Sequence, residues 1–600
     1  MLAFLLPTLL LSFQDAGSVH VVIHGGPQIV SELRAEGFDA WSAPRRSTGK
    51  LVAAEAMLAS NELSKLREGF RVVSILERSR PFREINAARR RARPMAPPDP
   101  SYKTPKEIED ELARLERTFP KLAKRYDLNS RTGAALTHGG RRIYGLRVSD
   151  NPSRDEDEPR ILLVSNHHAR ELNSIEVALF VAEKLLKQYS LDAKIKKLVD
   201  ENEIWLVPTM NPDGLDYVWT KNNMWRKNRR DSGGGNFGVD LNRNYPYFWS
   251  RCGSSRSARS DTYHGPSAGS EPETRLMLAF AKREGFERLL DIHSYSRDIR
   301  TPFNPLVRAA IPTSVRAFYD PMHRTLAGAM SYRTNTSCCC GGDMEFHHAT
   351  YGTLAFLVEL GTAFQPKYSE TQAELTRVWP GLRLFLEKPA PMRGHVRSLR
   401  GRAPLVAQIT VQGSSFANGE KRRSAERDGR YAVWLGSGTY DVVFTAPGHL
   451  PQTQRVTLTS SQTLDRDVLL IPDVPAPILT VRGSARIGTT SFLELSSSSD
   501  AGRPFFVGAS FSDQPAIRVG PRYVPLAPGP LFDIQLQTPT VFANFVGQLD
   551  TAGRATSAFH IPNWPVIIGL PFHFCGMSFE AGWPMNVRGI SNGVKIVIGR

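Results

Sequence analysis

The sequence predicts an α/β protein whose largest domain is a mixed β-sheet covered by helices on both faces. A small α/β domain is expected before it and two β-sandwich domains after it. Residues 160–166 form an apolar run without helical period, as a buried central strand does, and residues 172–189 have the spacing of an amphipathic helix. Residues 18–95 contain a strand–helix–strand pattern twice. From residue 389 onward, short alternating strands and turn signals replace the helices.

The N-terminus has the composition of a targeting segment followed by a small domain. Residues 1–17 are mostly apolar, too short to span a membrane and typical of a signal peptide, which predicts a secreted, periplasmic or extracellular protein. An N-terminal strand is the alternative for this stretch. The α/β domain of residues 18–95 ends in a basic tract at residues 89–93, and a Pro-rich stretch continues to residue 100. This composition indicates a linker.

Residues 96–388 make up the predicted central domain. It begins with a helix over residues 102–128, where Ile108, Leu112 and Leu115 have helical spacing. The other elements that we predict here, besides the strand at 160–166 and the helix at 172–189, are a turn and strand at 139–148, strands at 204–208 and 354–361, and a helix near 371–386.

A metal-binding pattern follows the strand at residues 160–166. His168 and Glu171 lie three residues apart at a strand-to-helix junction, where open α/β sheets place their ligand sites. Alone, this pair is also compatible with a surface histidine and a glutamate favoured by the helix dipole. A second apolar run, residues 289–292, ends in His293. Two histidines and one glutamate, with a fourth position left to water, are a ligand set of catalytic zinc, so we predict one Zn2+ per chain.

These motifs, in this order, resemble the zinc metallocarboxypeptidases of the carboxypeptidase A type over residues 102–388. The resemblance implies a zinc exopeptidase fold and a peptide or protein substrate with a free C-terminal carboxylate. Segment 224–229 matches the family segment whose arginine, here Arg226, polarises the scissile carbonyl. Segment 238–244 matches the one whose Asn242 and Arg243 hold the terminal carboxylate, a group that a guanidinium fork suits.

The same resemblance assigns the remaining site residues. Glu359 is the one charge in an apolar strand and matches the family's general base, which takes a proton from zinc-activated water and passes it to the leaving amine. Arg170, Ser294 and Tyr295 complete the predicted substrate-binding set.

The flanking domains also resemble family neighbours. Residues 18–95 resemble the inhibitory pro-segment of these enzymes, with a cleavage site in the basic tract; a permanent N-terminal domain is the alternative. Residues 389–472 resemble the transthyretin-like domain of regulatory carboxypeptidases. Residues 473–600 are a β-rich domain whose role stays open between surface or glycan contact and stabilisation.

The chain departs from the family at the substrate side of the site. Ser337 occupies the position where the family usually has a mobile tyrosine, which puts the tightness and specificity of substrate binding in question more than the zinc chemistry. The specificity position falls near Met344, which favours apolar side chains, but acidic neighbours leave the preference open. Of five cysteines, Cys252 is expected to pair with one of the consecutive cysteines at 338–340.

Composition excludes several other classes. The 76 basic and 59 acidic residues give a net charge of +17, but the basic residues are spread along the chain without a patch that predicts nucleic-acid binding. After the N-terminus no apolar run is long enough for a membrane span. We therefore predict a secreted zinc carboxypeptidase. The alternatives are the same chemistry on cell-wall or isopeptide-linked substrates, and a non-catalytic protein that binds peptide ends or surfaces.

Overall fold

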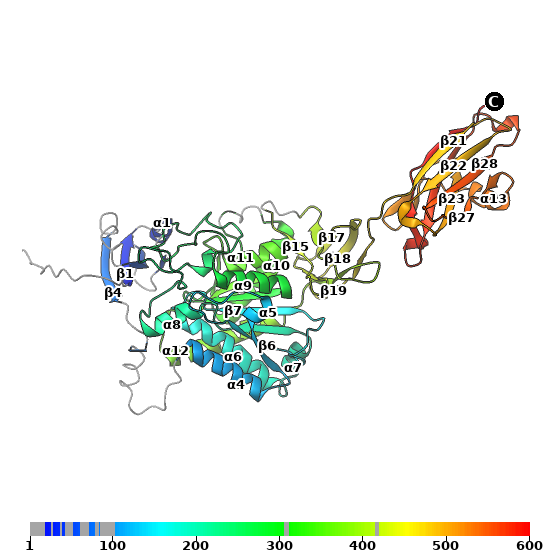
Figure 1. The fold of residues 1–600 in the computed structure, drawn as a ribbon. Coiled ribbons are helices and arrows are strands. Elements are labelled where there is room, and N and C mark those ends of the chain that lie inside the picture. The colour runs from blue at the N-terminus through cyan, green and yellow to red at the C-terminus, as the bar shows by residue number, and fades with distance from the viewer. Residues whose placement is uncertain are drawn as a thin grey trace, which may run out of the picture. The chain divides into compact units, whose positions relative to one another are not determined.

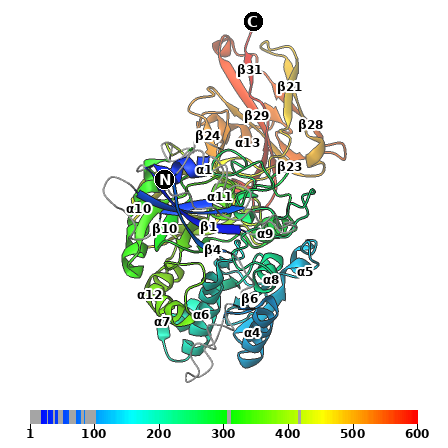
Figure 2. The ribbon, with the colours of Figure 1, turned by 90° about the vertical axis from the view of Figure 1, so that its left-hand side faces the viewer.

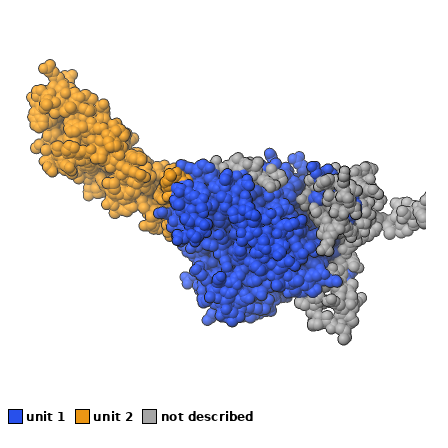
Figure 3. All heavy atoms as spheres, turned by 180° about the vertical axis from the view of Figure 1, so that it is seen from behind, with its two compact units in different colours: residues 1–394, 410–440, 456–466 blue, residues 395–409, 441–455, 467–600 orange. Residues whose placement is uncertain are grey.

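An eight-stranded mixed sheet forms the centre of the first of two compact units in the computed structural model (Figure 1). The structure describes residues 18–25, 28–35, 39–42, 52–59, 71–78, 83–84, 102–304, 306, 311–414 and 419–600. The expected signal peptide and the linker at 89–100 lie outside this part of the chain. The first unit comprises residues 1–394, 410–440 and 456–466, and the second comprises 395–409, 441–455 and 467–600 (Figure 3).

The strands of the central sheet are β5 (Ala123–Asp127), β6 (Tyr144–Val148), β7 (Arg160–Ser165), β8 (Glu203–Val207), β9 (Arg288–His293), β10 (Asp298–Thr301), β11 (Arg333–Thr336) and β12 (Leu354–Glu359). Their order is β11-β10-β12-β9-β7-β8-β6-β5. The four central strands β12, β9, β7 and β8 run parallel, and antiparallel pairs join them to β10 and β6. Every residue of β7 is buried, which agrees with the apolar run in the sequence.

Helices cover both faces of this sheet, as predicted for the α/β fold class. The helices α4 (Pro105–Thr118), α6 (Leu172–Gln188) and α12 (Tyr368–Leu386) lie on one face, and α9 (Pro272–Glu284) and α11 (Asp343–Tyr351) on the other (Figures 1 and 2). The remaining helices of this region are α5 (Leu128–Thr132), α7 (Ala193–Asp200), α8 (Pro212–Thr220), α10 (Thr313–Met330) and the 3-10 turn η1 (Leu241–Arg243). A core that includes Leu162, Trp205 and Phe280 fills the space beneath α9 and α11.

The helix expected over residues 102–128 is shorter in the structure. Thr104 starts α4 with a capping box, and the helix ends at Thr118, two residues before Pro120, which cannot continue it. Residues 123–127 instead form β5, which pairs with β6. The helical spacing at Ile108, Leu112 and Leu115 was correct, but extending it beyond Pro120 was wrong.

The N-terminal residues that are described form a four-stranded sheet with one helix. Its elements are β1 (Ser18–Gly25), α1 (Ile29–Ala35), β2 (Asp39–Ser42), β3 (Val52–Ala59) and β4 (Arg71–Arg78). The strand order is β2-β3-β1-β4, and β1 is antiparallel to both neighbours. The second amphipathic stretch, predicted as a helix between Val52 and Phe70, is wrong in its first part, because residues 52–59 form the strand β3. Its remainder, residues 60–70, lies outside the described residues.

The rest of the chain is β-rich. Between residues 392 and 470, two four-stranded sheets are formed by β13 (Met392–Ser398), β14 (Gln408–Val411), β15 (Arg422–Arg423), β16 (Arg430–Val433), β17 (Gly438–Thr445), β18 (Gln452–Leu458), β19 (Leu464–Asp465) and β20 (Val468–Leu470). The transthyretin-like assignment of residues 389–472 stays a prediction, as do the other predicted domain limits.

The C-terminal β-region has its own aromatic core, which includes Phe505, Phe559 and Phe574. A four-, a five- and a two-stranded sheet are built from β21 (Ile478–Gly483), β22 (Thr490–Ser496), β23 (Pro504–Ser510), β24 (Ile517–Val519), β25 (Arg522–Val524), β26 (Phe542–Ala543), β27 (Val546–Gln548), β28 (Arg554–His560), β29 (Pro571–Phe579), β30 (Val587–Ile590) and β31 (Val594–Val597). The helix α13 (Leu531–Gln537) packs against β23. Among the described residues, no helix combines the length and apolar character that a bilayer crossing requires.

Candidate metal centre and active site

The predicted site residues gather at the carboxyl ends of three neighbouring parallel strands, β12, β9 and β7. Glu359 and His293 end adjacent strands and are register partners, and His168 follows β7 by three residues. Open α/β sheets place ligand sites at this edge. Glu171 is the N-cap residue of α6 but makes no side-chain capping hydrogen bond, because its carboxylate turns to the histidines instead.

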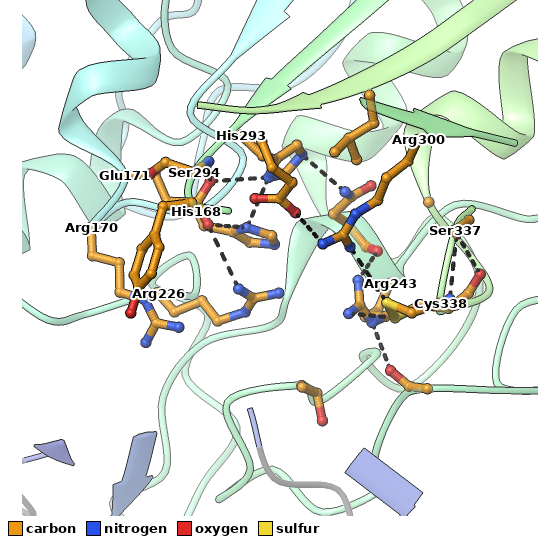
Figure 4. Close-up of a pocket in the computed structure, with 18 of the residues that line it drawn as sticks. His168, Arg170, Glu171, Arg226, Arg243, His293, Ser294, Arg300, Ser337 and Cys338 are labelled. Atoms are coloured by element: carbon orange, nitrogen blue, oxygen red, sulfur yellow. Dashed lines mark hydrogen bonds and ion pairs between the residues drawn. A yellow bond between two sulfur atoms is a disulfide. The ribbon is translucent and has the colours of Figure 1, made fainter. Parts of the chain in front are cut away.

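The side chains of His168, Glu171 and His293 point at one another (Figure 4). Glu171 Oε1 lies 2.7 Å from His168 Nδ1, and Glu171 Oε2 lies 3.0 Å from His293 Nδ1. The two Nδ1 atoms are 3.0 Å apart. Burial alone would raise the pKa of Glu171, but the two histidines outweigh it and hold that pKa below its usual range. The three residues therefore offer two imidazole nitrogens and an ionised carboxylate to one point.

Two buried aspartates orient the histidines. Asp240 Oδ1 accepts from His168 Nε2 at 3.0 Å, and Asp291 Oδ2 lies 3.1 Å from His293 Nε2. Because a carboxylate accepts, the Asp240 contact favours the proton on His168 Nε2 and leaves His168 Nδ1 for a metal. His293 Nε2 lies between Asp291 Oδ2 and the amide nitrogen of Asn242, which is 3.0 Å away. Burial opposes ionisation of Asp240, but Arg226, Arg243 and His168 hold its pKa well below the usual value. The donor set and its orientation fit zinc.

A second group of donors shares His293 with this set. His167, Asp291 and His293 also lie close enough to hold an ion. However, Asp291 is already directed at His293 Nε2 and, through Oδ1, at His167 Nδ1 at 3.1 Å. His168 and Glu171, but not His167, belong to the lining of the cleft. The lining of the cleft therefore favours His168, Glu171 and His293 as the candidate metal donors.

Glu359 lies beside a buried arginine that the sequence analysis did not single out. Arg300 Nη2 is 3.2 Å from Glu359 Oε1, and Arg300 Nε donates to Asp298 Oδ1 at 3.0 Å. Burial raises the pKa of Glu359, although Arg300 opposes the rise. A carboxylate with a raised pKa can both take up and release a proton near neutral pH.

The predicted cationic residues surround the same cleft. Arg226 donates to Asp240 Oδ2 through Nε at 3.1 Å and Nη2 at 2.8 Å. Arg243 is held by the backbone oxygens of Asn242 and Gly253, each at 2.7 Å. The Arg170 guanidinium lies over the Phe364 ring, 4.3 Å from its centroid. The structure brings all of the predicted site residues to one cavity of about 90 Å³, namely His168, Arg170, Glu171, Arg226, Asn242, Arg243, His293, Ser294, Tyr295 and Glu359.

A comparison with known proteins finds a family that is similar to the region around this cleft. Residues 108–371 match the family model described as zinc carboxypeptidase. Residues 108–371 of this chain are therefore similar to the zinc carboxypeptidases. Zinc is accordingly the metal that the domain implies, and the match includes all ten residues of the predicted site.

Individual relatives match about a third of this chain. Metallocarboxypeptidase A of Trichophyton tonsurans is 35% identical over 216 residues, which are 34% of this chain and 50% of that protein. Zinc carboxypeptidase A 1 of Anopheles gambiae is 35% identical over 204 residues, 34% of this chain and 44% of the relative. This chain thus spans about half the length of the curated relatives that it matches.

The relatives also include a protein named as inactive. Inactive metallocarboxypeptidase ecm14 of Talaromyces marneffei is 35% identical over 188 residues, 30% of this chain and 32% of that protein. Among solved structures, carboxypeptidase A of Helicoverpa armigera aligns with 62% of this chain and 97% of its own, with a TM-score of 0.49 and 21% identity.

The position of the family's mobile tyrosine lies in the wall of the cleft. Ser337 is part of this wall, and its hydroxyl donates to the backbone oxygen of Cys339 at 3.2 Å. Tyr332, the nearest tyrosine in sequence, is buried and donates to Glu374 Oε1 at 2.6 Å. Tyr295, which packs edge-on against Phe364, supplies an aromatic wall instead.

The cysteines of the carboxypeptidase domain lie against the substrate side. Cys252 pairs with Cys340, as expected, and this disulfide joins the loop after η1 to the residues before α11. Cys338 and Cys339 form a second, vicinal disulfide and line the cleft. Cys575 is free and buried.

Sequence reasoning missed several residues that belong to the site. Asp240 and Asp291 were visible as acidic residues within the quoted motifs, but their contacts with His168 and His293 depend on the folded sheet. Arg300 gave a weaker signal, a basic residue in a short strand, and Glu345 was visible only as an acidic neighbour of Met344. Burial raises the pKa of Glu345 to about 7.

Proposed function

We propose that this protein is a secreted zinc metallocarboxypeptidase that hydrolyses the C-terminal peptide bond of peptides or proteins. The observation that carries the proposal is the position of Glu359 beside the three metal donors, in one cleft with Asn242 and Arg243. The zinc carboxypeptidase domain supplies the chemistry class, and the cleft supplies a group for each step.

Four side chains of the cleft have a task in this proposal. Asn242 and Arg243 bind the terminal carboxylate, which limits cleavage to the last bond of the chain. When bound, zinc polarises the scissile carbonyl and lowers the pKa of water. Glu359 takes the proton of the attacking water and delivers it to the leaving amine. Arg226, fixed by Asp240, stabilises the negative charge that develops on the carbonyl oxygen.

Secretion is supported by two features of the chain. Residues 1–17 have the composition of a signal peptide. The Cys252–Cys340 disulfide is the kind of cross-link that forms and persists in oxidising compartments.

The test is hydrolysis of a panel of N-blocked dipeptides with and without a zinc chelator. We expect chelator-sensitive release of the C-terminal residue. Glu359→Gln should lower kcat about 10²- to 10⁴-fold while leaving one zinc per chain, because the substitution removes the proton acceptor and keeps the shape. Glu370→Gln, an exposed residue at the start of α12, is the matched control and should retain activity.

Two other outcomes would contradict the proposal. Zinc bound without turnover of any dipeptide would favour a cell-wall or isopeptide-linked substrate, or a protein that only binds peptide ends. A chain that binds no zinc would exclude the metal-dependent enzyme.

A further inference from the structure

The cleft contains more positive charge than cleavage of a C-terminal bond requires. In the described part of the chain, Arg170, Arg226, Arg243 and Arg300 line it. Under the proposed function, Arg243 takes the terminal carboxylate and Arg226 the carbonyl oxygen. Arg300 has no part in either step, yet its side chain is only 13% exposed. Burying a guanidinium is costly unless anionic groups surround it, and Asp298 and Glu359 do so here. The question is what the remaining edge of this guanidinium binds in the cleft.

The position of Arg300 follows from the edge of the sheet. It lies on β10, opposite Leu357 of the antiparallel strand β12, and its side chain extends into the cleft (Figure 4). Asp298 Oδ1 accepts from Nε at 3.0 Å, and Glu359 Oε1 lies 3.2 Å from Nη2. Asp298 also accepts hydrogen bonds from Ser296 and Asn335, which fix its carboxylate. The Nη1 atom has the Cys338 sulfur, a weak acceptor, at 3.7 Å.

Arg300 and Arg243 converge on adjacent residues. Arg243 Nη2 lies 3.0 Å from Cys339 Sγ, and Arg300 Nη1 lies 3.7 Å from the neighbouring Cys338 Sγ. Figure 4 shows both guanidinium groups on the side of the cleft that carries Ser337 and Cys338. A substrate carboxylate held by Arg243 therefore brings the side chain of the same terminal residue close to Arg300.

The Nη1 and Nη2 atoms of Arg300 form the edge at which a substrate anion can bind. An anionic group of the substrate at this edge would pair with the guanidinium in the two-point geometry that carboxylates favour.

We propose that Arg300 selects substrates whose C-terminal residue carries a side-chain carboxylate, glutamate or aspartate. This inference rests on the proposed carboxypeptidase function and adds the substrate class. The terminal residue is then held as a dicarboxylate, its α-carboxylate by Asn242 and Arg243 and its side chain by Arg300. Met344, whose sequence position favoured apolar side chains, lies in the hydrophobic core beneath the sheet.

The experiment compares N-blocked peptides that differ only in a C-terminal Glu, Gln, Leu or Lys. Glu and Gln have the same shape, so their ratio isolates the charge. We expect kcat/KM for Glu to exceed that for Gln on the order of 100-fold, as for a desolvated charge pair. Arg300→Gln should bring the ratio close to one, and Arg300→Lys, which keeps the charge but loses the fork, should give an intermediate value.

A matched variant and a stability check complete the design. Arg297→Gln removes a charge three residues away that pairs with Glu374 outside the cleft lining, and should leave the Glu-to-Gln ratio unchanged. Zinc content and thermal unfolding establish that each variant is folded. If Arg300→Gln fails to fold, the Glu-to-Gln ratio of kcat/KM in the wild type and in Arg300→Lys still tests the proposal.

The outcomes separate this inference from the proposed function. If Leu, Lys or Gln is released as fast as Glu or faster, and the release is chelator-sensitive, the acidic preference is overturned. The proposed carboxypeptidase function then still stands. An equal loss of activity on all four peptides in Arg300→Gln would make Arg300 a positioning residue for Glu359 and also overturn it. Release from none of them, with zinc bound, would refute the proposed function and this inference with it.

Discussion

At the scale of single residues, side chains in the site contact one another instead of satisfying their own helix or turn. Glu171 stands at the N-cap of α6 without capping it, because His168 and His293 engage its carboxylate. Asp240 similarly contacts His168 and Arg226, so one buried carboxylate orients both the proposed metal donor and the cation that we propose stabilises the oxyanion. These dual contacts make Asp240 the most sensitive residue among those outside the donor set.

Asp240→Asn should therefore weaken both metal binding and catalysis. The amide keeps the size of the side chain, but it neither fixes the His168 tautomer as a carboxylate does nor balances Arg226. We expect zinc affinity to fall about 10- to 100-fold, as found for partners that orient metal-binding histidines. Competition with a chelator of known affinity measures this, and Asp231→Asn in a nearby exposed turn is the control. An affinity equal to the wild-type value would contradict the assignment of the metal to His168.

A buried histidine on α11 predicts how stability depends on pH. Burial lowers the pKa of His348 to about 3, and its Nδ1 lies 3.0 Å from the Tyr319 hydroxyl. The folded pKa is below the unfolded value near 6.5, so the unfolded chain binds more protons between these limits. The free energy of unfolding should therefore fall as pH decreases from about 6.5, by up to about 1.4 kcal/mol per pH unit from this residue.

Chemical denaturation at pH 7 and pH 5 measures this slope. His348→Gln should show a shallower fall in the free energy of unfolding than the wild type, whatever its stability at pH 7. Comparing the two proteins cancels the acid-induced loss of zinc that both share. Identical slopes would mean that His348 does not remain neutral in the folded protein.

At the scale of elements, the sequence predicts what is local and misses what depends on pairing. The β7 strand, the His168–Glu171 junction and α6 follow each other in the chain, so apolar pattern and spacing predict all three. Arg300 instead enters the cleft because β10 pairs antiparallel with β12, beside Glu359. No pattern within the four residues of β10 indicates that pairing.

The loop between β15 and β16 is an element whose role also appears only in the structure. Arg427 pairs with Glu203 at the start of β8, with Nη2–Oε1 at 2.8 Å, and with Glu284 at the end of α9, with Nη1–Oε2 at 3.2 Å. Both carboxylates are fully buried. The neighbouring Asp428 pairs with Arg160 of β7 at 2.9 Å. The loop therefore ties β15 and β16 to β7, β8 and α9, and of these β7 leads into the site.

Arg427→Met should destabilise the first unit by about 3 kcal/mol, at the low end for breaking a buried ion pair. The low end applies because Glu284 keeps Arg131 and Glu203 keeps Arg147 as partners. Denaturant unfolding measures the change. Arg455→Met, at an exposed pair with Asp441, is the control and should change stability by less than about 0.5 kcal/mol. A loss for Arg427→Met as small as the control would show that the loop contacts are dispensable.

At the scale of the whole molecule, the N-terminal domain bears on access to the cleft. Ala40 of β2 is among the residues that line the cleft, so part of residues 18–95 lies where a substrate would enter. The sequence offers a basic tract at residues 89–93 at which the domain could be released. Together these features favour a removable inhibitory segment over a permanent domain.

Cleavage after Arg93 should therefore activate the protein. Removing a cover that competes with substrate is expected to raise kcat/KM by more than about tenfold, which corresponds to only 1.4 kcal/mol of covering contacts. The measurement compares dipeptide hydrolysis by the intact and the cleaved chain at equal zinc content. A chain with residues 89–93 replaced by Gly and Ser, treated with the same protease, separates release of the domain from cuts elsewhere. Equal activity before and after the cut would show that residues 18–95 leave the cleft open and form a permanent domain, because a segment that blocks substrate entry cannot be removed without effect.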